Sequence, residues 1–150
     1  MPNILHRLSI DAPPERVYQL AATREGIQQW WTGHPVAGDD TIGGQLSFYF
    51  REPADTAAAT FEVEGRSPEQ IVWRCVNGPQ DWIDTRITFA LKPRPDGGTT
   101  LLFSHQGWQR ENEFMNGCST NWAAYLTSLK SGAEGNSFNA YPGGEISRWD

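Results

Sequence analysis

The hydrophobic positions of the chain repeat with two different periods, and the period changes near residue 107. Residues 99–106 (TTLLFSHQ) alternate, so Phe103 and His105 share one face of a half-buried strand. Along residues 114–129 the apolar positions recur at spacings of three and four, which predicts an amphipathic helix. A strand followed by such a helix needs a sheet on which the helix can pack, and the preceding sequence provides one.

Five further stretches alternate in the same way. Strands are predicted at residues 4–10, 45–50, 59–64, 71–75 and 82–92. Turn sequences separate most of them: residues 65–68, Asn77-Gly78-Pro79 and residues 94–98 (RPDGG). Short turns between consecutive strands indicate an antiparallel meander. Residues 33–44 are polar and rich in glycine, and we expect a loop there.

Two short helices are predicted between the first two strands. Prolines suit the first turn of a helix, and Pro13-Pro14 precedes a helical pattern over residues 15–22. Thr23 is a suitable N-cap for a second helix that reaches Trp30 or Trp31. Adjacent helical positions point about 100° apart. Only one of these two tryptophans is therefore expected to point fully inward.

This order of elements predicts an α+β helix-grip fold. We expect a six-stranded curved antiparallel sheet wrapped round a long C-terminal helix, with two short helices after the first strand. Residues 1–150 should form a single domain. Residues 133–150 should be a tail packed on the body, because a disordered tail rarely carries large side chains such as Phe138, Tyr141, Ile146 and Trp149. A curved sheet and one helix do not pack flush everywhere, so an apolar pocket is expected between them.

The composition excludes several classes of partner. A net charge of −6 argues against nucleic acid and against electrostatic binding to anionic lipid. No apolar run approaches the roughly 20 residues that cross a bilayer, and the first residues do not resemble a signal peptide, so a cytoplasmic location is expected. Cys75 and Cys118 are then expected to be free buried thiols. The seven tryptophans could fill a core or line an apolar cavity.

Four stretches resemble a known superfamily. They are residues 10–31 (IDAPPERVYQLAATREGIQQWW), 68–75 (PEQIVWRC), 85–108 (TRITFALKPRPDGGTTLLFSHQGW) and 116–130 (NGCSTNWAAYLTSLK). In this order and spacing they resemble the START-related, polyketide-cyclase-like (SRPBCC) helix-grip superfamily. Within it they are similar to the branch named after the activator of the heat-shock-protein-90 ATPase. The resemblance implies the helix-grip fold and leaves the activity open, because superfamily members bind lipids, hormones or polyketides and only some are enzymes.

The candidate site is the set of side chains that face the space between sheet and helix. The expected ligand-binding residues are Trp30, Phe48, Phe50, Phe61, Trp73, Phe89, Phe103, His105, Phe114, Met115, Cys118 and Trp122. Each of them could equally be ordinary core. His105 could orient a ligand or act as an acid or base near neutral pH, or it could be a buried histidine satisfied by a neighbour. His6, inward on the first strand, poses the same choice.

We therefore predict that the protein binds a small hydrophobic or aromatic molecule between the sheet and the C-terminal helix. One alternative is an enzyme of cyclase or dehydratase type that uses His105. Another is a co-chaperone-like interaction module with a chaperone as its partner. The sequence has no metal-ligand spacing, phosphate-binding loop or dinucleotide motif, so no metal or cofactor is expected. It leaves open whether the protein is a monomer or a homodimer.

Overall fold

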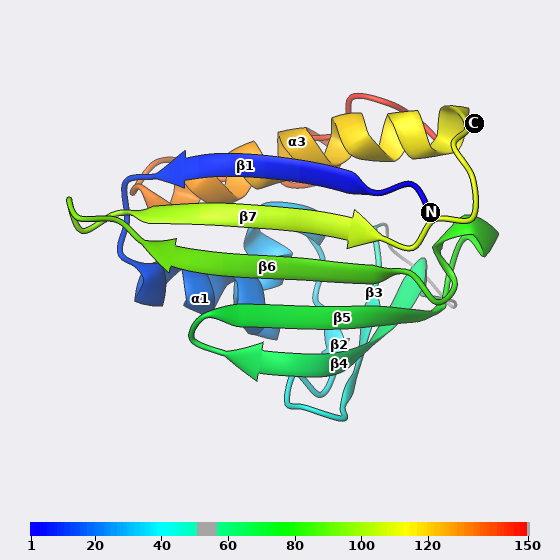
Figure 1. Cartoon of the computed structure of the whole chain (residues 1–150), viewed down its shortest axis with the longest axis horizontal. Coiled ribbons are helices and arrows are strands. Elements are labelled where there is room, and N and C mark those ends of the chain that lie inside the picture. The colour runs from blue at the N-terminus through cyan, green and yellow to red at the C-terminus, as the bar shows by residue number, and fades with distance from the viewer. Residues whose placement is uncertain (51–56, 150) are drawn as a thin grey trace.

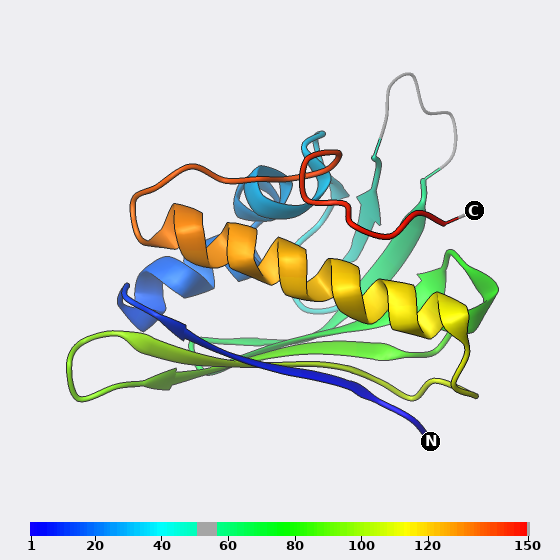
Figure 2. The same cartoon turned by 90° about the horizontal axis from the view of Figure 1, so that it is seen from above.

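The protein folds as one antiparallel sheet with a long helix, α3 (Glu113–Ala133), lying across one of its faces. This computed structural model describes residues 1–50 and 57–149. Figure 2 shows that the sheet curves round α3 and that the short helices lie on the same side of the sheet. The model therefore has the α+β architecture with a C-terminal helix that the sequence predicts.

The sheet order places the first strand beside the last. Along the chain the elements are β1 (Ile4–Ile10), α1 (Pro14–Ala22), α2 (Arg24–Ile27), η1 (Gln28–Thr32), β2 (Ala37–Gly38), β3 (Gln45–Phe48), β4 (Ala59–Ser67), β5 (Gln70–Asn77), η2 (Gln80–Trp82), β6 (Arg86–Pro93), β7 (Thr99–Gln106) and α3. In space the strands follow the order β1-β7-β6-β5-β4-β3-β2. All neighbouring pairs are antiparallel. The strand that precedes the helices thus pairs with the strand that leads into α3 (Figure 1).

The sheet has seven strands where the sequence predicts six. The extra strand is β2, in which Ala37 pairs with Ser47 and Gly38 with Leu46 of β3. Both β2 residues are exposed. A strand of two exposed residues shows no alternation of hydrophobicity, so its glycine-rich surroundings predict a loop instead.

Several strand boundaries also differ from the predicted ones, and two of these differences have a clear structural cause. β6 begins at Arg86 and not at Trp82, because Trp82 ends a 3₁₀ turn and Asp84 adopts φ 66°, which is not a strand conformation. β4 continues through Gly65, where a turn was predicted, because Gly65 lies at a shift in the β4–β5 register. Glycine in a strand commonly marks such a bulge.

The short helices form a tightly connected unit. Thr23 caps α2 as expected, since its hydroxyl accepts a hydrogen bond from the Gly26 N–H at 3.0 Å. η1 is a single π-helical turn, and it buries both Trp30 and Trp31. The expectation that only one tryptophan points inward is therefore wrong. A π turn spaces side chains differently from an α turn, and α3 covers the side of η1 that would otherwise face solvent.

Gly26 provides a test of the contact between α1 and α2. A Cβ atom at this position would lie 2.4 Å from the Gln19 carbonyl oxygen and 2.6 Å from Leu20 Cα. Both are backbone atoms, so the helices would have to separate. Gly26→Ala is expected to lower the free energy of unfolding by about 1–3 kcal/mol in urea denaturation. Gly65→Ala is the control for a general cost of replacing glycine, because its φ is not positive and an added Cβ atom would lie no closer than 3.4 Å to a neighbour. An unchanged stability of Gly26→Ala would contradict this packing.

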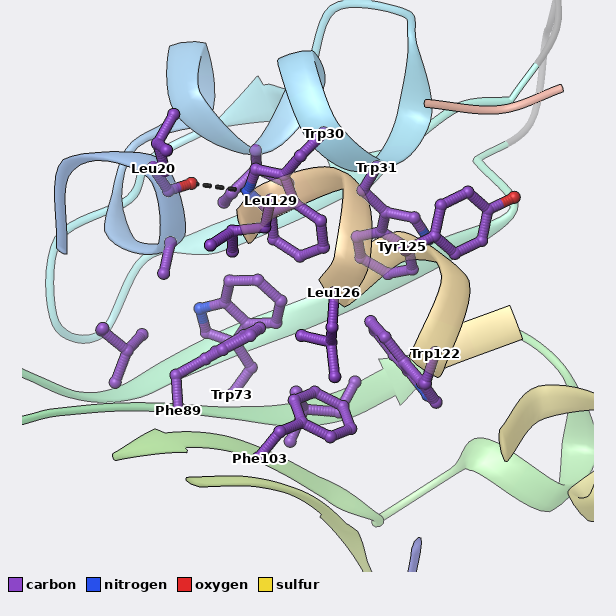
Figure 3. Close-up of a cluster of buried hydrophobic side chains, with 14 of the residues drawn as sticks. Leu20, Trp30, Trp31, Trp73, Phe89, Phe103, Trp122, Tyr125, Leu126 and Leu129 are labelled. Carbon is purple, nitrogen blue, oxygen red and sulfur yellow. Dashed lines mark hydrogen bonds between the residues drawn. The ribbon is translucent and has the colours of Figure 1, made fainter. Parts of the chain in front are cut away.

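The core lies between the inward rows of the sheet and α3. Alternate strand residues are buried as predicted, for example Ile87, Phe89 and Leu91 on β6. The α3 stripe faces them with Trp122, Leu126 and Leu129, among others. Figure 3 shows how these side chains interdigitate. The space directly beneath the helix is consequently filled by protein side chains.

Residues 134–149 return along α3 on the side away from the sheet (Figure 2). The Tyr141 N–H donates to the Trp31 carbonyl at 2.9 Å, and the Asn139 N–H donates to Ser128 Oγ at 2.7 Å. Phe138 packs against the face of α3 at Gly132, where a Cβ atom would overlap its ring. The C-terminal segment is thus held against both η1 and α3.

Candidate functional site

A pocket of about 480 Å³ opens beside α3. It lies between the N-terminal half of α3, η1, the end of β3 and the C-terminal segment. Its lining residues are Trp31, Tyr49, Phe50, Ala58, Trp82, Cys118, Asn121, Trp122, Tyr125, Tyr141, Glu145, Arg148 and Trp149. Most of these are aromatic. The pocket is therefore an aromatic recess at the flank of the helix.

Trp31 connects the pocket to the core. Its ring lies 4.9 Å from the Trp122 ring on α3 and 5.5 Å from the Phe50 ring after β3. On its inner side it stacks parallel to Trp73 with 6.4 Å between ring centroids. Because Trp31 is only 2% exposed, these neighbours hold it in place. This side of the pocket is therefore supported by packing against the core.

The C-terminal segment forms the opposite side of the pocket. Trp149 packs edge-on against Phe50, Trp82 and Phe114 at centroid distances of 6.3, 5.5 and 5.8 Å. Tyr141 packs edge-on against Phe50 at 5.4 Å. One face of the pocket therefore exists only because this segment is docked.

Asn121 on α3 fastens the segment in place. Its Oδ1 accepts hydrogen bonds from the N–H groups of Ile146 and Ser147, both at 2.9 Å. Its Nδ2 donates to the Ser147 carbonyl at 2.7 Å. Asn121 is 6% exposed, so its amide is nearly fully desolvated and three of its hydrogen-bonding positions are used. A single buried side chain thus clamps the backbone beside the pocket.

Asn121→Ala is expected to release residues 145–149 from α3. Three hydrogen bonds are lost and two backbone N–H groups lose their partner, which should cost about 1–3 kcal/mol of local stability. Hydrogen exchange of the Ile146 and Ser147 amides should accelerate by at least about tenfold, while amides in β6 stay protected. Thr120→Ala, one residue earlier on an exposed position, is the control. Unchanged exchange in Asn121→Ala would show that the clamp does not hold the segment.

The residues predicted to line the pocket divide into three groups. Phe50, Cys118 and Trp122 line it. Phe114 and Met115 lie in the first turn of α3, near but outside the lining. The others are at most 2% exposed and belong to the packed core beneath the helix: Trp30, Phe48, Phe61, Trp73, Phe89, Phe103 and His105. Among these, the indole N–H of Trp30 caps the end of α1 by donating to the Leu20 carbonyl at 2.8 Å (Figure 3).

His105 is held in a continuous chain of hydrogen bonds. Trp122 Nε1 donates to His105 Nδ1 at 3.1 Å, so the proton of the neutral ring resides on Nε2. Nε2 then donates to Thr85 Oγ1 at 2.7 Å, and the Thr85 hydroxyl donates to the Trp82 carbonyl at 2.6 Å. Burial lowers the pKa of His105 to about 3. With both ring nitrogens occupied and the pKa lowered, the geometry favours a structural role over acid–base catalysis.

The other candidate groups also have ordinary partners. His6 is half-buried on β1 and lies 3.3 Å from Ser119 Oγ on α3. Cys75 and Cys118 are free and buried as predicted, and burial raises the pKa of each thiol to about 12. Such thiols are poor nucleophiles. Within residues 1–50 and 57–149 no His, Cys, Asp and Glu side chains gather in a group that could hold a metal ion.

Several pocket residues could not be identified from hydrophobic periodicity. The helical spacing predicted that only one of Trp30 and Trp31 points inward, and it did not identify which. Tyr49 directly follows β3, and Ala58 directly precedes β4. The C-terminal segment has no periodicity. The available signal was the aromatic content of that segment, which indicated that it packs on the body but not where it packs.

Among the helices described, none is both long and apolar enough to cross a membrane.

A curved antiparallel sheet, one long helix across it and a pocket beside that helix define a START-related helix-grip protein. The chain belongs to the family described as activator of Hsp90 ATPase homolog 1-like protein, whose model matches residues 11–134. This confirms the resemblance identified from the four sequence stretches. A search of curated proteins found no match.

Solved structures agree with this assignment. The solution structure of the Aha1 dimer from Colwellia psychrerythraea is 33% identical, with a TM-score of 0.77 over 89% of this chain and 97% of that chain. The Staphylococcus saprophyticus protein SSP2350 is 18% identical, with a TM-score of 0.74 over 93% and 97%. PFC0360w, an Hsp90 activator from Plasmodium falciparum, is 18% identical, with a TM-score of 0.68 over 85% and 92%. The last two similarities establish the fold alone.

Proposed function

We propose that the protein binds a small apolar or aromatic molecule in the pocket between α3, η1 and the C-terminal segment. The observation that carries this proposal is the pocket itself, about 480 Å³ in volume and lined mainly by aromatic rings. Sites for small molecules in proteins are commonly concave, mostly apolar and of roughly 300–1,000 Å³. The proposed site is at the flank of α3, because the space between α3 and the sheet is packed.

Rigidity on one side of the pocket supports the proposal. Trp31 and Trp122 are each 2% exposed and are fixed by neighbouring rings, so they need no reordering when a ligand binds. A preformed site loses less conformational entropy on binding than a flexible one. The flat faces of these rings suit an aromatic or branched aliphatic ligand.

Filling the pocket with a larger side chain tests the proposal. Ala58 lines the pocket and the adjacent Ala57 does not, so Ala58→Trp and Ala57→Trp form a matched pair. The probe is the neutral fluorophore N-phenyl-1-naphthylamine, with stoichiometry checked by native mass spectrometry. Ala58→Trp should weaken binding by at least about tenfold, equivalent to 1.4 kcal/mol, and Ala57→Trp should not. Absence of saturable binding to the unmodified protein, or equal binding by the two variants, would reject the proposal.

A second candidate function is interaction with an Hsp90-type chaperone. Family membership and 33% identity to an Aha1 structure favour it. On the outer face of the sheet Leu5 and Leu102 are 66% and 37% exposed, and they could contribute to such a contact. Purified protein should then raise the ATPase rate of Hsp90, and Leu5→Glu should reduce that effect. No stimulation at saturating concentration would exclude this function.

A further inference from the structure

The pocket has one polar edge, formed by Tyr125, Tyr141 and Glu145. Tyr125 is only 5% exposed, yet its hydroxyl forms no hydrogen bond with any residue in the described ranges. Figure 3 shows this hydroxyl directed away from the aromatic cluster, on the side of the ring opposite Trp31. Tyr125 lines the pocket, and Tyr141 and Glu145 line it as well. Two hydroxyls and a carboxylate are thus among the groups that line the pocket.

Glu145 is held at this edge by the backbone on both sides. Before it, Gly144 lies so close to the Tyr125 ring that a Cβ atom would be 2.9 Å from Cε1. After it, the N–H groups of Ile146 and Ser147 are bound by Asn121. The Glu145 N–H itself donates to the Pro142 carbonyl at 3.1 Å. These contacts therefore fix the backbone from which the Glu145 side chain projects.

The Glu145 carboxylate has no cationic partner in the part of the chain that the structure describes. Burial, followed by the charge of Glu145, raises the pKa of the Tyr125 phenol. The side chain is half-buried. A partly desolvated carboxylate without a partner favours the approach of a positive charge.

The aromatic rings favour a positive charge for a separate reason. The face of an aromatic ring carries partial negative charge, and rings in a cluster attract alkylammonium groups through cation–π contacts. Trp31, Tyr141 and Trp149 present such rings in the pocket. The opposing feature is Arg148, which also lines the pocket. Arg148 is exposed at the rim, whereas Glu145 is more buried.

We propose that the pocket selects cationic amphiphiles, with the apolar part of the ligand against Trp31 and its ammonium group beside Glu145. This proposal rests on the proposed binding function and names the chemical class that the site prefers. An ammonium group would offset the charge of Glu145 and be attracted electrostatically by the negative faces of the surrounding rings. A quaternary ammonium needs no hydrogen-bond acceptor, and a primary amine could also donate to the free oxygen of Tyr125.

Three probes with the same alkyl chain test the class of ligand. Decyltrimethylammonium, decanol and decyl sulfate are titrated below their micelle concentrations, with tryptophan fluorescence and native mass spectrometry as readouts. The cation should bind at least about tenfold more tightly than the anion. Tightest binding by decyl sulfate or by decanol would overturn the proposal and leave the proposed function standing. If no probe binds and the neutral fluorophore also fails to bind, the proposed function itself is rejected.

Two charge variants assign the preference to a residue. Glu145→Gln keeps the size of the side chain, removes its charge and should reduce the preference for the cation to the part that the aromatic rings provide. Arg148→Gln removes the nearby positive charge, and this variant should keep or increase the preference for the cation. Circular dichroism and thermal unfolding confirm that both variants fold. An undiminished cation preference in Glu145→Gln would show that Glu145 does not select the ligand, and would overturn the proposal.

Discussion

His105→Leu is expected to lower the free energy of unfolding by about 3–5 kcal/mol at neutral pH. The imidazole is completely buried and makes two side-chain hydrogen bonds. Its ring also packs 4.8 Å from the Trp108 ring. Leucine fills part of the volume but leaves the Trp122 N–H without an acceptor in a buried site, and such an unsatisfied donor is costly. Urea denaturation monitored by tryptophan fluorescence measures the loss.

The same residue should make the protein sensitive to acid. Burial lowers the pKa of His105 to about 3 in the folded state, whereas a histidine in the unfolded chain has a pKa near 6.5. Between these values the unfolded chain binds one more proton than the folded protein does. Stability due to His105 is therefore fully present above about pH 6.5 and is lost as the pH falls towards 3, by roughly 1.4 kcal/mol per pH unit.

A comparison of the unmodified protein with His105→Leu isolates the contribution of His105 to the acid sensitivity. His105→Leu should remove the added acid sensitivity, so its free energy of unfolding should fall less steeply between about pH 6 and pH 4 than that of the unmodified protein. His6→Gln, at a half-buried histidine, controls for an unspecific effect of losing a histidine. Parallel pH profiles for the unmodified protein and His105→Leu would mean that His105 is protonated in the folded state. The hydrogen-bond chain through Trp122 and Thr85 would then be misassigned.

The strands and the core were predictable because alternation fixes which face of a strand is buried. On β6 the phase of Thr85, Ile87 and Phe89 was correct even though the strand begins later than predicted. The period-2 pattern continues through the turn at Asp84, and hydrophobicity alone does not reveal that this residue has a positive φ. The alternation of hydrophobic residues therefore identifies the buried face of a strand more reliably than it identifies where the strand begins or ends.

The pocket was less predictable because its residues come from segments without periodicity. Besides the aromatic content of the C-terminal segment, two glycines inside α3 were a second signal, since glycine in a helix interior costs about 1 kcal/mol relative to alanine. A Cβ atom at Gly117 would lie 2.7 Å from Ser147 Oγ, and one at Gly132 would overlap the Phe138 ring. Both glycines therefore mark where the C-terminal segment approaches the helix. The two glycines indicate that another part of the chain approaches α3 closely at these positions, but the sequence does not identify which segment it is.

Trp31→Ala is expected to cost about 3–5 kcal/mol and to abolish binding of the neutral fluorophore. Trp31 contacts the rings of Phe48 and Trp73 in the core and that of Phe50 at the pocket. Removing the indole leaves a cavity between η1 and α3 that these rings cannot fill without moving. Differential scanning calorimetry measures the stability, and fluorescence titration measures the binding.

Trp149→Ala is the matched comparison, because Trp149 lines the same pocket from the C-terminal segment but is 46% exposed. Its loss should cost about 1 kcal/mol or less, since much less apolar area returns to water. Binding should weaken without being abolished, because the rigid side of the pocket formed by Trp31 and Trp122 remains. Equal destabilisation by the two substitutions would contradict the distinction between the side of the pocket at Trp31, which the core supports, and the side at Trp149, which the C-terminal segment provides. Equal loss of binding with unequal loss of stability would instead show that ligand affinity depends on closure by the C-terminal segment as much as on the core.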